Sequence, residues 1–151
     1  MEGIKKTAKP KTPVSAKIMV FGTFDILHKG HLNFFKQARA LSQKPYLVVS
    51  VARDRNVEKI KGFSPQNSEK QRAKLLKKVK LVDKVVLGGL KKHLPHIAKE
   101  APRFIALGYD QKNYIRNLGK SLKKIGLGTK IVRLKAYRPH LYKSSIMKHK
   151  S

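Results

Sequence analysis

Residues 20–35 read VFGTFDILHKGHLNFF, a stretch in which an apolar run gives way to a turn and then to a helical pattern. The apolar run starts at residue 17 and ends in Gly22, which is typical of a buried strand. From Gly30 to the breaker Pro45, apolar side chains recur at helical spacing, namely at Leu32, Phe34, Phe35, Ala38 and Leu41. The stretch therefore predicts a strand over 17–22, a loop, and a helix that begins near Gly30.

The same unit of strand and helix recurs along the chain. Apolar, valine-rich runs predict four more strands, over residues 46–53, 83–88, 103–108 and 129–134. Helices are predicted from Ser68, over 93–101, over 113–125 and, as a last short piece, near Ser144. Ser68 and Gln71 have the spacing of a capping box. The polar segment 54–67, interrupted by Gly62 and Pro65, is predicted to be a long loop.

This alternation of strands and helices indicates a fold. Parallel strands need right-handed crossovers of helix length, so the sheet is covered on both faces. We expect an α/β protein, a Rossmann-like three-layer α/β/α sandwich with a five-stranded parallel sheet. In such sheets ligands bind beyond the carboxyl ends of the strands, where the direction of the connections reverses. The expected site is built from the loops after the first, fourth and fifth strands, GTFDILHKGH, GYDQKN and KAYRPHLYKSS.

Length and composition bound the organisation of the chain. Its 151 residues suffice for one domain with a hydrophobic core, and we expect a basic, flexible tail over 1–16 and a single domain over 17–151. The absence of cysteine excludes disulfides and thiolate metal sites. No apolar run approaches the roughly 18 residues that cross a bilayer. We expect a cytoplasmic protein without a membrane partner.

The charge is unusual for an ordinary enzyme. There are 36 lysines and arginines against 8 acidic residues, a net charge of +28, and most of this excess lies outside the tail. Such a field attracts polyanions, which include nucleotides, nucleic acid and anionic membrane surfaces. A generally basic, solvated surface without a dedicated partner is the alternative.

Two histidines follow the first predicted strand. His28 and His31 lie one helical turn apart, at a helix start where unpaired N–H groups and the dipole favour an anion. Gly30 between them lets a phosphate approach the backbone, and Gly22 and Thr23 give a tight exit from the strand. One alternative is half of a zinc site, although no glutamate lies between the histidines as it does in the metalloprotease helix motif. Another alternative is a chance pair of surface histidines. The pattern favours a phosphate site.

The whole string G-T-F-D-x-L-H-x-G-H resembles the signature of the nucleotidyltransferase superfamily, whose smallest members are glycerol-3-phosphate cytidylyltransferases. The likeness extends over about residues 17–148 and is greatest to archaeal-type FAD synthetases, at VARDRNVEKIKG (51–62), VDKVVLGGLKKHL (82–94), LGYDQ (107–111) and IVRLKAY (131–137). Those enzymes adenylylate FMN to FAD. The resemblance implies direct attack of a phosphate oxygen on the α-phosphorus of a nucleoside triphosphate, with Mg²⁺ bridging phosphates and His28 and His31 as catalytic residues.

The resemblance also suggests further site residues. It places Lys59 and Lys61 in a flexible loop that closes over the triphosphate, although two lysines mean little in so basic a chain. The resemblance also directs Arg72 toward the site. An exposed position of Arg72 on a helix explains the sequence equally well. The resemblance makes the turn a nucleotide-binding element, through Gly22, Thr23, Phe24 and Gly30.

Acidic and hydroxyl side chains complete the predicted site. Asp25 can cap the helix, orient a histidine or help to hold Mg²⁺. By resemblance, the loop of Asp110 contacts the nucleotide base and ribose, although an aspartate that makes a turn is the alternative. Arg138, Ser144 and Ser145 match positions of the cytidylyltransferase pattern R-T-E-G-I-S-T-T, and are assigned to nucleotide binding. Its Thr-Glu-Gly is replaced here by Pro139, His140 and Leu141, which disfavours CTP.

The resulting functional hypothesis is an FMN adenylyltransferase that uses ATP and Mg²⁺. Glycerol-3-phosphate cytidylyltransferase, or transfer to another small phosphate, is the nearest alternative. A nucleic-acid-binding protein on the same scaffold is the alternative from another class, since the charge permits nonspecific binding. Candidates for a flavin slot are Phe63, Tyr109 and Tyr137, which are equally plausible as packing residues. Small relatives are commonly dimers, so a homodimer is one option, but the sequence does not determine the oligomeric state.

Overall fold

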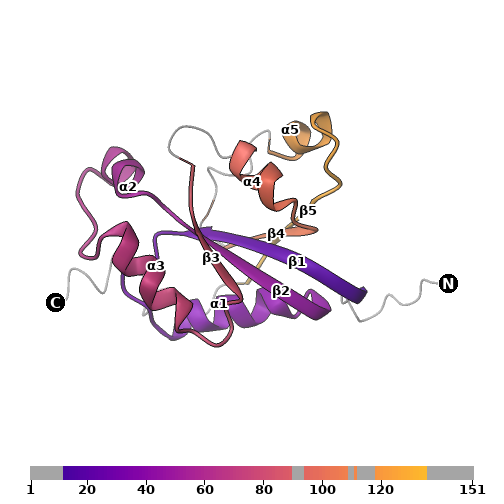
Figure 1. Ribbon diagram of the computed structural model, residues 1–151, viewed down its shortest axis with the longest axis horizontal. Coiled ribbons are helices and arrows are strands. Elements are labelled where there is room, and N and C mark those ends of the chain that lie inside the picture. Colours follow the sequence, from indigo (N-terminus) through magenta and orange to yellow (C-terminus); the bar gives the residue numbers. More distant parts are fainter. Residues whose placement is uncertain (1–11, 90–93, 109–110, 112–117, 136–151) are drawn as a thin grey trace.

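The computed structural model describes residues 12–89, 94–108, 111 and 118–135. Five parallel strands form one sheet in the order β3-β2-β1-β4-β5 (Figure 1). The strands are β1 (Thr12–Gly22), β2 (Ser42–Val51), β3 (Lys84–Leu87), β4 (Phe104–Leu107) and β5 (Lys130–Arg133). The predicted five-stranded parallel sheet is confirmed.

Helices cover both faces of this sheet. The helices are α1 (Lys29–Arg39), α2 (Asp54–Lys61), α3 (Glu69–Lys77), α4 (Leu94–Glu100) and α5 (Leu118–Lys124). In Figure 1, α1 and α3 lie on one side of the sheet and α4 and α5 on the other. The predicted three-layer sandwich is therefore confirmed. No helix in the described part of the chain is long and apolar enough to cross a membrane.

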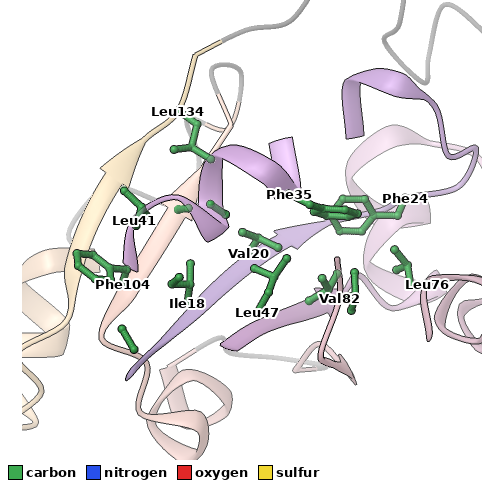
Figure 2. Close-up of a cluster of buried hydrophobic side chains, with 14 of the residues drawn as sticks. Ile18, Val20, Phe24, Phe35, Leu41, Leu47, Leu76, Val82, Phe104 and Leu134 are labelled. Carbon is green, nitrogen blue, oxygen red and sulfur yellow. The ribbon is translucent and has the colours of Figure 1, made fainter. Parts of the chain in front are cut away.

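The side chains of β1 alternate between two cores, because successive residues of a strand face opposite sides of the sheet. Ile18 and Val20 join the core beneath α1 and α3, which Figure 2 shows. Met19 and Phe21 join the core beneath α4 and α5. All four side chains are at most 3% exposed, so β1 is the central element on which both layers pack.

The first strand is longer than predicted. It begins at Thr12 rather than at residue 17, so the assignment of residues 12–16 to a flexible tail was wrong. Residues 12–16 pair with β2 from Ser42 onward, with an irregularity between Thr12 and Ser15. Backbone pairing forms this part of the strand, and its side chains supply no apolar pattern that the sequence could reveal. Residues 1–11 lie outside the described part, where the predicted tail stays a prediction.

The predicted loop over 54–67 was also wrong, because its first eight residues form α2. Asp54 lies in the first turn, where a carboxylate is favourable, and Gly62 ends the helix with φ of 82° while its N–H bonds to the carbonyl of Glu58. Val57 is the only buried residue of α2. One buried position gives no helical periodicity, so the apolar pattern could not detect this helix.

The remaining elements were predicted with shifted ends. The capping box of Ser68 and Gln71 is present at the start of α3, and confirms that helix. The helices predicted over 93–101 and 113–125 correspond to α4 and α5. The short helix predicted near Ser144 lies outside the described residues.

Candidate active site

The candidate site lies at the carboxyl ends of β1 and β4. These two strands are neighbours in the sheet, yet the chain passes through β2 and β3 between them, so the connections diverge on either side of this pair. Gln111 joins the two strand ends: its Nε2 donates to the carbonyl of Phe21 at 2.6 Å, and its Oε1 accepts from the N–H of Gly108 at 2.8 Å. Sequence reasoning missed this role, because a glutamine in a loop gives no signal of its partners.

Residues 23–31, called here the histidine segment, connect β1 to the first turn of α1. The helical spacing suggested that His28 lies in the first turn of α1. In the structure His28 is instead the N-cap of that helix. Its Nδ1 accepts a hydrogen bond from the N–H of Gly30 at 3.1 Å. A ring nitrogen that accepts from a backbone N–H carries no proton, so the neutral ring holds its proton on Nε2. His28 is thereby set as an Nε2–H donor.

His31 packs directly against His28. The two rings are stacked, with centroids 3.9 Å apart and an angle of 24° between their planes. Nδ1 of His31 is buried and makes no hydrogen bond with the described part of the chain. Burial and, to a smaller extent, the neighbouring His28 together lower the pKa of His31 to about 3. Burial also lowers the pKa of His28. Both rings are therefore neutral at physiological pH before a ligand binds.

This arrangement suits an anion with oxygen atoms. A buried polar atom without a partner has lost its water, and a ligand oxygen within reach would supply the missing hydrogen bond. His31 offers such an atom beside the start of α1, where the helix dipole favours negative charge. The N–H of Gly30 is already used by His28, so the predicted approach of phosphate to this backbone group competes with the cap.

Phe24 packs between His31 and the hydrophobic core. It is buried, and its ring packs edge-on against His31 with centroids 5.3 Å apart and against Phe35 at 5.5 Å, as Figure 2 shows for the two phenylalanines. Its φ of 51° is a left-handed conformation that a bulky residue rarely adopts. A Cβ at Gly22 would lie 2.7 Å from the Phe24 ring. Gly22 is thus required because Phe24 folds back over it, which is a more specific reason than a tight strand exit.

Asp25 fixes the histidine segment to the turn before α3. Its Oδ2 accepts from the N–H of Gln66 at 2.7 Å, and its Oδ1 accepts from the N–H of Asn67 at 2.8 Å. The carboxylate is 3% exposed. It does not cap α1, because His28 does so. A carboxylate whose two oxygens are held by backbone N–H groups in the interior does not fit a resident Mg²⁺ site, and the described residues contain no cluster of three or more metal-ligating side chains.

Arg72 is buried, which contradicts the alternative of an exposed helix arginine. Its guanidinium is 0% exposed and donates to the carbonyl of Thr23 at 2.8 Å. The carbonyl oxygen of Thr23 is thus engaged from the side of α3, and the predicted contact of Thr23 with the nucleotide stays a prediction. The sequence pointed Arg72 toward this region without revealing that it contacts the backbone of the motif.

Lys59 and Lys61 lie on α2 and not in a loop. Both are exposed. The exposed position of these lysines agrees with contact to a ligand at the rim of the site, and their predicted role stays a prediction.

Several predicted site residues lie outside the described part of the chain. These are Asp110, Arg138, Ser144 and Ser145, together with the flavin-slot candidates Tyr109 and Tyr137. Their roles in binding the nucleotide or the acceptor stay predictions.

The acidic residues that the structure describes serve the fold. Six of the eight lie in the described part, since Glu2 and Asp110 lie outside it, and each makes a hydrogen bond or an ion pair with its own neighbourhood: Asp25, Asp54, Glu58, Glu69, Asp83 and Glu100. Glu100, for example, is 5% exposed between Lys17 and Lys84, whose bonds lower its pKa although burial acts in the opposite sense. The six carboxylates are thus engaged in contacts within the protein, and the electrostatic field at the surface is positive.

Comparisons with known proteins agree with this geometry. The cytidylyltransferase-like family model matches residues 19–150. The chain belongs to the cytidylyltransferase-like family. It is 41% identical over 133 residues to the FAD synthase of Thermococcus sibiricus, which covers 87% of this chain and 86% of that protein. Identity to the FAD synthase of Pyrococcus abyssi is 42% over 128 residues, covering 84% and 82% of the two chains.

A solved structure shares this fold. The crystal structure described as a lipopolysaccharide core biosynthesis protein from Thermoplasma volcanium superimposes with a TM-score of 0.74 at 36% identity. It covers 81% of this chain and 98% of its own. The recognised family and the Rossmann-like fold are therefore both confirmed.

Proposed function

We propose that this protein is an FMN adenylyltransferase, which converts ATP and FMN into FAD and pyrophosphate. The FAD synthases to which it is similar supply the reaction. The observation in the fold that carries the proposal is the stacked pair of neutral histidines at the start of α1, with a buried Nδ1 that lacks a partner in the described chain. The pair lies at the carboxyl end of β1, where a sheet of this kind binds nucleotides.

In the proposed reaction an oxygen of the FMN phosphate attacks the α-phosphorus of ATP. A new phosphorus–oxygen bond forms as the bond to the β-phosphate oxygen breaks, and pyrophosphate leaves with the bonding electron pair. No covalent enzyme intermediate is formed. The work of the protein is to hold the reacting phosphates in line and to stabilise the negative charge that accumulates on them.

The two rings serve this purpose as hydrogen-bonding groups. The Nε2–H of His28 is set to donate because Nδ1 is occupied by the N–H of Gly30. His31 binds through its buried Nδ1, which must carry the proton when a phosphate oxygen accepts from it. A phosphate close to either ring favours the protonated form and so opposes the effect of burial on the pKa. Mg²⁺ is assigned to the substrate, as the cation that neutralises the ATP phosphates.

The lysines and the start of α1 complete the positive surroundings. Lys59 and Lys61 stabilise the triphosphate from α2, and Asp110, Arg138, Ser144 and Ser145 are assigned to the nucleotide. A cytoplasmic location and a homodimer remain predictions.

Purified protein incubated with ATP, FMN and Mg²⁺ tests the function. FAD, resolved chromatographically, is the expected product, and its formation should require all three components. CTP with glycerol 3-phosphate serves as the matched pair of alternative substrates. Product from that pair, and none from ATP with FMN, would replace the proposal by a cytidylyltransferase.

The basic charge supports nucleic-acid binding as a second candidate property. With a net charge of +28, affinity for RNA should fall steeply as salt is raised. Binding that is insensitive to salt, or absent at 50 mM salt, would remove this candidate without affecting the enzymatic one.

A further inference from the structure

The carboxyl-terminal half of α2 and the turn after it stand away from the core. Residues 58–64 are all exposed, and they include the two lysines predicted to contact the triphosphate. We call these residues the lysine arch. Its own packing is slight, because Val57, just before it, is the only buried residue of α2. The residues that flank the arch therefore help to set its position.

The first end is held by reciprocal capping of two helices. The N–H of Asp54, at the start of α2, donates to Oε1 of Glu69 at 2.8 Å. The N–H of Glu69, at the start of α3, donates back to Oδ2 of Asp54 at 3.1 Å. Each carboxylate thus satisfies an unpaired N–H of the other helix and lies at its positive end. Arg53 adds an ion pair to Glu69 at 3.3 Å.

The second end is held by the histidine segment. The carboxylate of Asp25 accepts from the N–H groups of Gln66 and Asn67, and the side chain of Asn67 donates to the carbonyl of Asp25 at 2.8 Å. The chain that returns from the arch is therefore bound to the residues that precede His28.

Arg72 joins both ends to the histidine segment. Its three nitrogens donate in three directions: Nε to the carbonyl of Asn67 at 3.0 Å, one terminal nitrogen to the carbonyl of Thr23 at 2.8 Å, and the other to Oδ1 of Asp54 at 2.6 Å. The side chain is 0% exposed, although it belongs to a helix whose other cations face solvent. One buried guanidinium thus contacts the start of α2, the return from the arch and the GTFD turn.

We propose that Arg72 is a positioning residue that sets the lysine arch relative to the histidine pair. This inference rests on the proposed function, because it assumes that Lys59 and Lys61 bind the triphosphate. A guanidinium is suited to the role, since its planar fork of donors has fixed directions, whereas a lysine ammonium is a single flexible point charge. Without the fork, partly buried acceptors on Thr23, Asn67 and Asp54 lose their bonds to a buried donor.

Arg72→Lys is the sharpest test, because it keeps the charge and removes the three fixed directions. Arg39→Lys is the matched control: Arg39 also bridges a backbone carbonyl and a carboxylate, those of Leu81 and Asp83, but contacts neither the arch nor the histidine segment. Hydrogen–deuterium exchange of peptides from 54–67 reports on the arch, steady-state kinetics reports on the reaction, and thermal unfolding reports on the fold. All are made on the full chain.

For Arg72→Lys we expect exchange in 54–67 to accelerate by about tenfold. The kcat for FAD formation should fall by about tenfold to a hundredfold, because a small misplacement of binding groups slows a reaction by this much. The KM for FMN should stay within about threefold of the wild-type value. Arg39→Lys should lower the unfolding temperature without either effect. Should Arg72→Lys fail to fold, Asp54→Asn, which removes the carboxylate that Arg72 contacts, must give the same pattern.

Equal exchange in 54–67 for the lysine variants of Arg72 and Arg39 would overturn the inference, and so would faster exchange with unchanged kcat. If the wild-type protein made no FAD, the proposed function would fail instead. The exchange measurement would still decide whether Arg72 holds the arch, because it does not depend on turnover.

Discussion

The histidine segment and the lysine arch both carry side chains assigned to the phosphates of one substrate, yet the protein holds them in opposite ways. His31 is stacked on His28, supported by Phe24 and buried enough to lower its pKa to about 3. Lys59 and Lys61 lie in an exposed stretch whose flanking residues are held by hydrogen bonds. The difference indicates that the histidines are positioned by direct packing against neighbouring rings, whereas the lysines are positioned through the residues that flank them.

Removal of either imidazole should have the largest effect if the histidines are preorganised. His28→Ala or His31→Ala should lower kcat/KM for FAD formation by about 100-fold to 1000-fold, the usual loss for a fixed donor to developing charge. His96→Ala is the control, because His96 lies on α4 and its Nε2 is hydrogen-bonded to the hydroxyl of Ser50 on β2. Near wild-type rates in both site variants, measured by steady-state kinetics, would show that the pair is not catalytic.

Acid should destabilise the histidine segment more than the arch. The unfolded chain binds a proton at His31 with an ordinary pKa of 6.5, while the folded site resists it down to about 3. Stability from this site is therefore complete above pH 6.5 and is lost as the pH falls toward 3, by roughly 1 to 3 kcal/mol at pH 4. His31→Gln should remove this part of the acid sensitivity, measured as unfolding temperature at pH 7 and pH 4. Parallel losses in the two proteins would contradict the burial of a neutral ring.

The packing of Phe24 against the histidine pair can be tested at Gly22. Gly22→Ala places a Cβ at 2.7 Å from the Phe24 ring, which must move and take His31 with it. We expect a loss of about 2 kcal/mol in unfolding free energy, by chemical denaturation, with reduced activity. Gly128→Ala is the matched control, because a Cβ there meets nothing within 4 Å. Equal stability of the two variants would show that the packing of Phe24 over Gly22 does not hold the site in place.

The arch should show the smallest effects, and of a different kind. Lys59→Ala and Lys61→Ala should leave the unfolding free energy within about 0.5 kcal/mol, as expected of exposed positions. Each should weaken kcat/KM for ATP by about tenfold, a loss that shrinks in high salt because exposed charges are screened. Lys124→Ala, exposed at the end of α5, supplies the control. A loss as large as that of the histidine variants would remove the contrast between the two regions.

The sequence predicted the sheet and the histidine pair because both leave local signals. Valine-rich runs mark the buried strands, and the fixed spacing of His28 and His31 marks a helix start. What it missed depends on contacts between distant residues. Gln111 bridges β1 and β4, and the buried Arg72 reaches Thr23, 49 positions away. The helix α2 was mistaken for a loop because it buries Val57 alone, and the early start of β1 comes from pairing with β2.

Nuclear magnetic resonance of the imidazole rings tests the central claim most directly. In the free protein, titration should show His31 neutral down to about pH 4 and His28 with its proton on Nε2. Addition of ATP and Mg²⁺ should shift the ring signals of His28 and His31 and leave those of His96 in place. A His31 that titrates near 6.5, or nucleotide binding that leaves both rings unperturbed, would contradict the assignment of this pair to the phosphates.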